Sequence, residues 1–396
     1  EAWDASLNKD GSVMAYTLDN DSNDLYEVYI AGYGEIKLSE AYHLFIDFSN
    51  VITLESLSLL DTSDVTTMSN MFRNCSKLAG EIDLSHFNMQ NVTSVEQMFM
   101  NDGKITTLKL NNWDAPKLTK VYEIFQWCKM ASIEMNNFNA PKLSDVSDMF
   151  GNGRLANIKS ISINNWNIPS VTNLYRMFYG CSKLTELNIE GFNAPSATNV
   201  ANMFYGCSSL AGTLDLSNFD TSNVTDMSNM FNGCSSVTNL DLSKFKTGKV
   251  KDMNKMFQYC SSLTNLDVSN FDTSEVTNMN CMFFYCSKLV NIDVSNFDTS
   301  NVTLLSSMFE FCNSLENLSF NNINLASATD ISNMIKNCPS LKTLDISGVN
   351  SSIYEKDIFK NMINQVGDIT FYVKDSECKT LLEAIKPNAT IEIQSV

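Results

Sequence analysis

The sequence predicts an α/β solenoid, in which short parallel strands line one face of a stack of coils and short helices line the other. The first observation is a two-residue marker, Met followed by Phe in most copies, which recurs twelve times in 396 residues. From Met230 onward its spacing is 26 residues every time. The second observation is that the hydrophobic period within each copy changes from that of a helix to that of a strand. A solenoid grows by adding coils, so a chain of this length needs no second core.

The copy at residues 221–246 shows both periods. Its first half has four apolar residues on one face of a two-turn helix: Val224, Met227, Met230 and Phe231. Its second half has the pattern L-x-x-L-x-L-x-x-F, formed by Val237, Leu240, Leu242 and Phe245. The L-x-L part alternates, as a short strand with one buried face should. This second half is the leucine-rich-repeat pattern, with Phe where that pattern usually has Asn or Cys. One coil cannot bury its apolar face alone, so we expect the coils to stack with their strands paired at about 4.8 Å.

Residues 41–351 carry about 12 such coils, and the two ends differ from them. Residues 1–40 have strand-like stretches at 13–16 and 26–30 and a Gly-rich turn at 32–34, which predict an N-terminal β cap. Residues 352–396 lose the repeat and predict an α/β cap, with helices at 352–363 and 377–385 and strands at 369–373 and 390–393. Caps of this kind cover the apolar faces of the end coils.

Two copies, NVTDMSNMFNGCSSVTNLDLSKF and EVTNMNCMFFYCSKLVNIDVSNFDTS, resemble the 26-residue repeat of the BspA-like leucine-rich-repeat proteins. The opening segment WDASLNKDGSVMAYTL is similar to the one that often precedes such repeats. The resemblance covers nearly the whole chain. It implies a secreted or surface-anchored bacterial protein, often an adhesin, without specifying a ligand. We therefore expect an extracellular or cell-surface location, with any signal or anchor outside this sequence.

Charge and motifs limit the possible functions. The net charge of −18 argues against a nucleic-acid partner and against docking on anionic lipid. No apolar run approaches the roughly 18 residues that a membrane span needs. The sequence has no Gly-rich phosphate loop, nucleophile elbow or metal-binding His pair, and two histidines leave little for acid–base chemistry. The sequence thus predicts a protein that binds a protein or glycan, with no enzymatic activity, metal or cofactor.

Nine of the eleven cysteines follow the first marker residue by four positions: Cys75, Cys128, Cys181, Cys207, Cys234, Cys260, Cys286, Cys312 and Cys338. Equivalent side chains of stacked coils point the same way, which fits disulfide geometry badly. The spacing predicts a ladder of reduced, buried thiols that pack as small apolar groups.

The exposed side of the predicted strands carries the first candidate site. Aspartates occupy one position in four consecutive coils, flanked by asparagines: Asp215, Asp241, Asp267, Asp293, Asn239, Asn265 and Asn291. Carboxylates about 5 Å apart repel unless something compensates them. They are either a groove for cations, a basic protein segment or sugar hydroxyls, or a solvated face that keeps the sheet soluble.

A row of aromatic residues is the second candidate site. Tyr259, Tyr285 and Phe311, in three consecutive coils, each precede a ladder cysteine, as Trp127 does in an earlier coil. An exposed row suits contact with sugar or protein, and a half-buried row would cover the edge of the core. Two functions follow from these features. The leading one is an adhesin-like surface protein that recognises a host or community macromolecule through its strand face, and the alternative is a structural spacer that presents another domain or partner.

Overall fold

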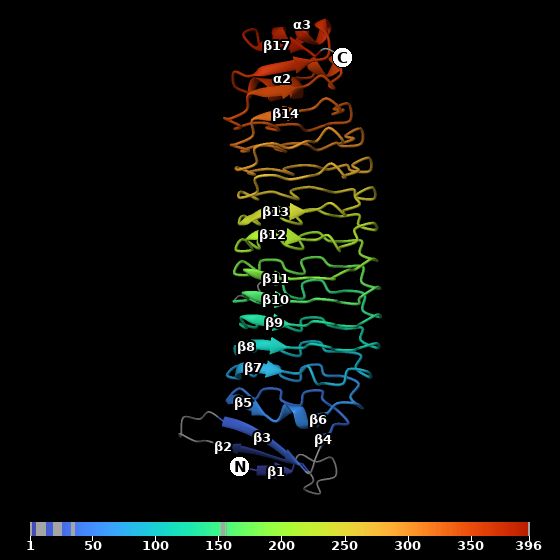
Figure 1. Ribbon diagram of the computed structural model, residues 1–396, viewed down its shortest axis with the longest axis vertical. Helices are drawn as coiled ribbons and strands as arrows, with labels where there is room; N and C mark the ends of the chain where they lie inside the picture. Colours follow the sequence, from blue (N-terminus) through green and yellow to red (C-terminus); the bar gives the residue numbers. More distant parts are fainter. Residues whose placement is uncertain are drawn as a thin grey trace. The chain divides into compact units, whose positions relative to one another are not determined.

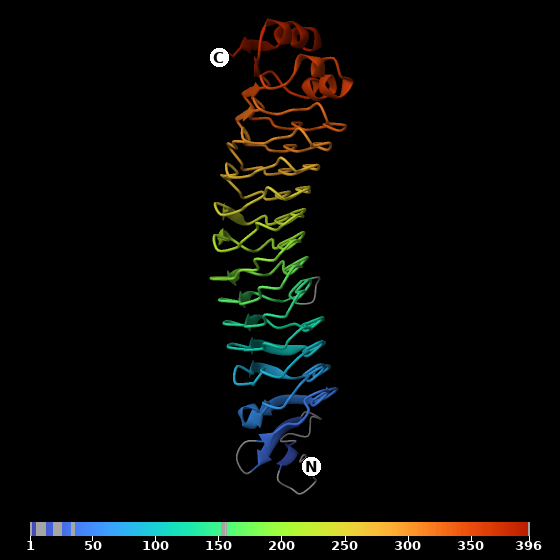
Figure 2. The same ribbon diagram turned by 90° about the vertical axis from the view of Figure 1, so that its right-hand side faces the viewer.

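The computed structural model describes residues 2–4, 13–18, 26–32, 36–151, 155 and 157–394. The chain divides into two compact units, residues 1–196 and 197–396. In each unit, successive coils lie side by side and are joined by backbone hydrogen bonds (Figures 1 and 2). The predicted parallel-strand solenoid is therefore confirmed for both units.

The first unit begins with strands that pair outside the repeat. Three are antiparallel neighbours: β1 (Ala2–Asp4), β2 (Val13–Leu18) and β3 (Tyr26–Gly32). Next come β4 (Ile36–Lys37), β5 (Val51–Glu55), a 3₁₀ turn (Leu57–Leu59) and β6 (Leu60–Asp61), with β5 parallel to β3 and β6 parallel to β4. The predicted turn at 32–34 falls mostly outside the described residues. A five-stranded parallel sheet follows: β7 (Ala79–Asp83), β8 (Lys104–Lys109), β9 (Ser132–Glu134), β10 (Ser160–Ser162) and β11 (Glu186–Asn188).

The second unit contains two separate parallel sheets. The first is the pair β12 (Gly212–Asp215) and β13 (Val237–Asp241). The second has four strands: β14 (Asn317–Ser319), β15 (Thr343–Asp345), β16 (Thr370–Val373) and β17 (Thr390–Ile393). Three helices accompany its C-terminal part: α1 (Ser351–Tyr354), α2 (Asp357–Asn364) and α3 (Ser376–Ile385).

The expectation of a strand in every coil is wrong for the two coils between β13 and β14. The segments around Leu266 and Ile292 do not pair as strands. The bond from the Val290 N–H to the Thr264 carbonyl is long, at 3.4 Å. Asp267 also raises the pKa of Asp293 by its charge, against the hydrogen bonds that lower it. Like charges on adjacent strand segments oppose pairing, yet Asp215 and Asp241 occupy the same position and pair in register between β12 and β13. Charge alone therefore does not explain the gap in the sheet.

The predicted helices of the repeat are also wrong: each marker segment is a run of tight turns. The Met230 N–H donates to the Met227 carbonyl at 3.2 Å, and Asn229 between them has a left-handed φ of 56°. The next N–H, that of Phe231, instead donates to Met256 of the following coil at 2.9 Å. Coils spaced at about 4.8 Å leave no room for helices about 10 Å wide. Among the described residues, α-helices occur only within 351–385.

The apolar residues of the marker form the core. In the second unit the rings of successive coils are fully buried and stack nearly parallel, with centroids 5.2–5.6 Å apart: Phe204, Phe231, Phe257, Phe283 and Phe309. Phe72 and Phe99 stack in the same way in the first unit, at 5.4 Å. The repeat therefore packs identical side chains against one another, so each coil buries its apolar marker residues against those of the next coil.

All eleven cysteines are free, and the thiol ladder is present. Eight of its nine members are buried, but Cys338 is partly exposed. Eight of the nine ladder thiols donate to the carbonyl of the marker Phe in the preceding coil. For example, Cys260 Sγ donates to the Phe231 carbonyl at 3.2 Å, and Cys286 Sγ to that of Phe257 at 3.1 Å. Burial raises the pKa of Cys234 to about 12, so these groups stay protonated and poorly nucleophilic.

Thiol labelling tests the ladder. Under native conditions we expect an alkylating reagent to modify the partly exposed Cys281 and Cys338 first, because burial withholds the other thiols from solvent. After denaturation without reductant, all eleven cysteines should react. Mass spectrometry of labelled peptides measures both steps, and a disulfide between ladder positions would contradict the structure.

Candidate functional site

The four predicted aspartates shape corners of the solenoid. Each accepts a hydrogen bond through Oδ1 from the backbone N–H two residues later, at 2.9–3.0 Å: Asp215, Asp241, Asp267 and Asp293. Such side-chain turns are a preferred role of Asp. The same Asp-x-Ser turn forms other corners, at Asp220, Asp226, Asp272 and Asp298. Recurrence of Asp at one position therefore has a structural cause of its own.

The aspartate column is nevertheless anionic and open to solvent. The backbone N–H and then the hydroxyl of Ser217 lower the pKa of Asp215. The hydroxyl of Ser269 and then its N–H do the same for Asp267, and Ser295 lowers the pKa of Asp293 likewise. Asp241 is half-buried and the other three are exposed. The carboxylates of Asp215, Asp267 and Asp293 are thus ionised at neutral pH.

The three predicted asparagines flank this column as expected, and all are exposed: Asn239, Asn265 and Asn291. Asn239 lies on β13, opposite Thr213 of β12. Asn291 forms an isolated parallel bridge with Asn317 of β14. The amide oxygen of Asn317 accepts a hydrogen bond from the Thr343 hydroxyl at 2.7 Å. The polar face therefore continues from the column onto the last sheet.

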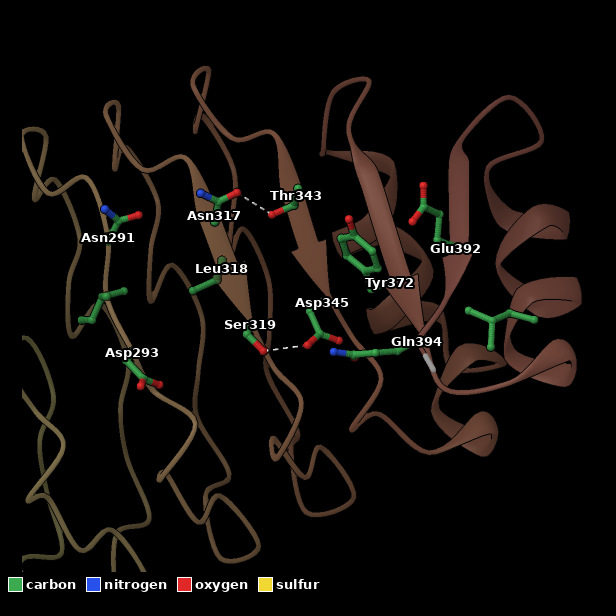
Figure 3. A pocket seen from close by; sticks show the side chains of 12 residues that line it. Asn291, Asp293, Asn317, Leu318, Ser319, Thr343, Asp345, Tyr372, Glu392 and Gln394 are labelled. Atoms are coloured by element: carbon green, nitrogen blue, oxygen red, sulfur yellow. Dashed lines mark hydrogen bonds between the residues drawn. The ribbon is translucent and has the colours of Figure 1, made fainter. Parts of the chain in front are cut away.

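A hollow of about 560 Å³ lies where the column meets that sheet (Figure 3). It brings together Asn291 and Asp293 of the predicted set, but neither the other predicted aspartates nor the aromatic row. The other ten lining residues come from the coils and the C-terminal strands: Ile292, Asn317, Leu318, Ser319, Thr343, Asp345, Tyr372, Glu392, Ile393 and Gln394. Tyr372, Glu392 and Gln394 lie after the repeat ends, where no period indicates which way a side chain points.

The hollow is acidic. Asp345 is 9% exposed, and its two oxygens accept bonds from the Ser319 hydroxyl at 2.8 Å and the Ser347 N–H at 2.9 Å. Asp293, Asp345 and Glu392 together give the hollow three carboxylates, and no lining residue is basic. In the described part of the chain, no three potential metal ligands come together. The hollow therefore favours a cationic group that carries its own hydrogen-bond donors.

The predicted aromatic row lies in the marker turns of the second unit. Tyr259 and Tyr285 are exposed, and Phe311 is half-buried. All three have a left-handed φ of 60–62°, a conformation that costs most side chains about 1–2 kcal/mol. The row borders a different hollow, formed with residues after the repeat.

Comparisons with known proteins identify a family. A family model described as "Mycoplasma protein of unknown function, DUF285" matches residues 40–162, 153–266 and 225–349. No curated protein matches the chain. Among solved structures, a chain from the crystal structure of a TLR13–ssRNA13 complex is similar, with 16% sequence identity and a TM-score of 0.28. The match covers 85% of this chain and 52% of the other, so it spans about half the length of that protein.

None of the described helices is both long enough and apolar enough to cross a bilayer. The three family matches overlap and together run through the coils of both units, from residue 40 to residue 349. The chain therefore belongs to the DUF285 family of Mycoplasma proteins of unknown function.

Proposed function

We propose that this chain is a non-catalytic, adhesin-like binding protein of the cell surface or extracellular space. It recognises a host or community macromolecule through its strand face, and the contacting segment is a basic stretch of a protein. The observation that carries this proposal is the acidic hollow at the end of the aspartate column, with three carboxylates and no basic lining residue.

The chemistry of the face supports a basic partner. Exposed, ionised carboxylates attract Lys and Arg over distances set by the ionic strength, and raise the rate of encounter. A volume of about 560 Å³ accommodates one or two such side chains, whose donors match Asp293 and Glu392. Tyr372 and the exposed Ile393 offer apolar surface to their aliphatic parts. A net charge of −18 disfavours nucleic acid as the ligand.

The alternative function is a structural spacer. The turn bonds made by all four column aspartates favour it, because they give the residues a role without any ligand. A spacer would bind basic segments no better than any acidic protein does. The two functions therefore differ in whether the position of the carboxylates matters, or only their number.

Replacing the column aspartates with Asn tests this difference. The variant D215N/D241N/D267N/D293N keeps an oxygen that can accept each turn bond, so the fold should persist. We expect its affinity for immobilised Lys- and Arg-rich peptides to fall at least about tenfold and to depend less steeply on salt. Surface plasmon resonance at low and high salt measures both effects.

The matched control is D220N/D226N/D272N/D298N, which removes the same charge from four other Asp-x-Ser corners. Its binding should change little. Equal losses in the two variants would instead support the spacer, since only total charge would then matter.

A further inference from the structure

The marker turns contain a position where an aromatic residue is unexpected. Two residues after the marker Phe, the backbone is left-handed in coil after coil. Gly and Asn fill this position at low cost in both units: Asn74, Asn101, Gly180, Gly206, Gly233 and Asn337. In three consecutive coils it holds Tyr259, Tyr285 and Phe311 instead. The local fold does not require these rings, and their backbone is strained, which is a feature of functional positions.

The three rings form a continuous surface. Centroids lie 5.7 Å apart between Tyr259 and Tyr285, and 5.8 Å apart between Tyr285 and Phe311. Phe284 inserts edge-on, 5.4 Å from Tyr259 and 5.6 Å from Phe311. We call these four residues the aromatic platform. Tyr259 is 45% exposed and Tyr285 40%, so the platform presents ring surface to solvent.

A hollow of about 640 Å³ adjoins the platform. Tyr285 and Phe311 line one part of it, and Asn313, Asn337 and Gln365 contribute exposed amides. Within the described residues, none of these three amide side chains hydrogen-bonds to protein. The hollow has one carboxylate, from Asp368, and no basic residue.

We propose that the aromatic platform and its hollow bind a neutral oligosaccharide. The C–H faces of a pyranose ring pack on aromatic rings, and its hydroxyls both donate and accept, as do the amides of Asn313, Asn337 and Gln365. An anionic ligand would find no cation here, and a basic one would find a single carboxylate. An apolar peptide would leave the amides without partners. This surface is separate from the strand face and goes beyond the proposed function.

The test is the double variant Y259N/Y285N. Asn already holds the same left-handed position at Asn74, Asn101 and Asn337, so the variant relieves backbone strain. This gain offsets the ring contacts that the variant loses with Phe284 and Phe311, so its melting temperature should stay close to that of the wild type. We expect its retention on an array of neutral glucose, mannose, galactose and N-acetylglucosamine oligosaccharides to fall at least about tenfold. Loss of binding without loss of stability separates a ligand role from a packing role.

The matched control is W127N, the same change at the same left-handed position in the first unit, where the side chain is 58% exposed. Its saccharide retention should equal that of the wild type. The proposal is overturned if the wild type retains no neutral saccharide or retains only peptides. It is also overturned if Y259N/Y285N keeps its saccharide retention, or if W127N loses it. The column variant D215N/D241N/D267N/D293N should keep full saccharide binding, so failure here and failure of the strand-face proposal are distinguishable.

Discussion

Replacing Met230 with Asp is expected to abolish cooperative folding of the second unit, or to lower its melting temperature severely. Met230 is completely buried, and its counterparts Met203 and Met256 in the adjacent coils are at most 1% exposed. A carboxylate at this position has no polar partner on either side. Burying an unpaired charge costs several kcal/mol, a large share of the stability of an ordinary domain.

Two controls define the effect. Met230→Leu preserves volume and polarity and should cost less than about 1.5 kcal/mol. Asp241→Asn removes a charge on the strand face while keeping an oxygen for the Ser243 N–H, so it should hardly change stability. Thermal unfolding followed by circular dichroism compares the three variants. Similar melting temperatures for M230D and D241N would show that the assigned register of the repeat is wrong.

Replacing Asp102 with Cys is expected to stabilise the first unit at neutral pH. Asp102 stands four residues after the marker residue Met98, where nine other coils carry a ladder cysteine. Its side chain is fully buried, Oδ1 accepts the Cys75 N–H at 3.0 Å, and Oδ2 has no partner. Leaving a buried polar atom unsatisfied costs about 1–3 kcal/mol. A thiol could donate to the Phe72 carbonyl, as Cys128 donates to that of Phe99.

The stability that D102C gains over the wild type should grow with pH. Burial raises the pKa of Asp102 well above its ordinary value. The folded protein therefore holds a proton that the unfolded chain releases above about pH 4. The stability that depends on this proton is complete below the unfolded pKa and is lost as pH rises toward the folded pKa. In D102C this loss disappears, so the difference from the wild type widens as pH rises.

Denaturant unfolding of both proteins across a pH series measures this difference. Asp102→Asn is a useful companion, because it removes the ionisation while leaving a polar group in the ladder. It should share the pH behaviour of D102C but gain less stability. Parallel pH dependences for D102C and the wild type would contradict a raised pKa at Asp102.

The period of the repeat predicted much of the fold, because each coil must bury its apolar residues on an identical neighbour. Phe231 and Phe257 stack since they are 26 residues apart, and Cys234 and Cys260 lie in one ladder for the same reason. The alternation in L-x-L likewise predicted the parallel pairing of β12 with β13. These features depend on local pattern and repetition, which are fully present in one sequence.

The structure of the marker segments was not predictable in this way. Met227, Met230 and Phe231 share a helical spacing, yet successive N–H groups alternate between their own turn and the next coil. The pattern shows which side chains are buried, and a run of tight turns buries the same ones as a helix. Only the close spacing of the coils, imposed by pairing between them, excludes the wider helix.

The candidate sites also combine features that the repeat predicts with features that depend on long-range packing. The sequence by itself determined the aspartate column and the aromatic row, because both repeat with the coils. Only the tertiary structure decided that Asp293 shares an acidic hollow with Asp345 and Glu392, and that Tyr285 borders the exposed amides of Asn337 and Gln365. Glu392 and Gln365 belong to the C-terminal segment, which follows no period. Their positions depend on how helices and strands pack against the last coil, and that packing is a long-range property of the folded chain.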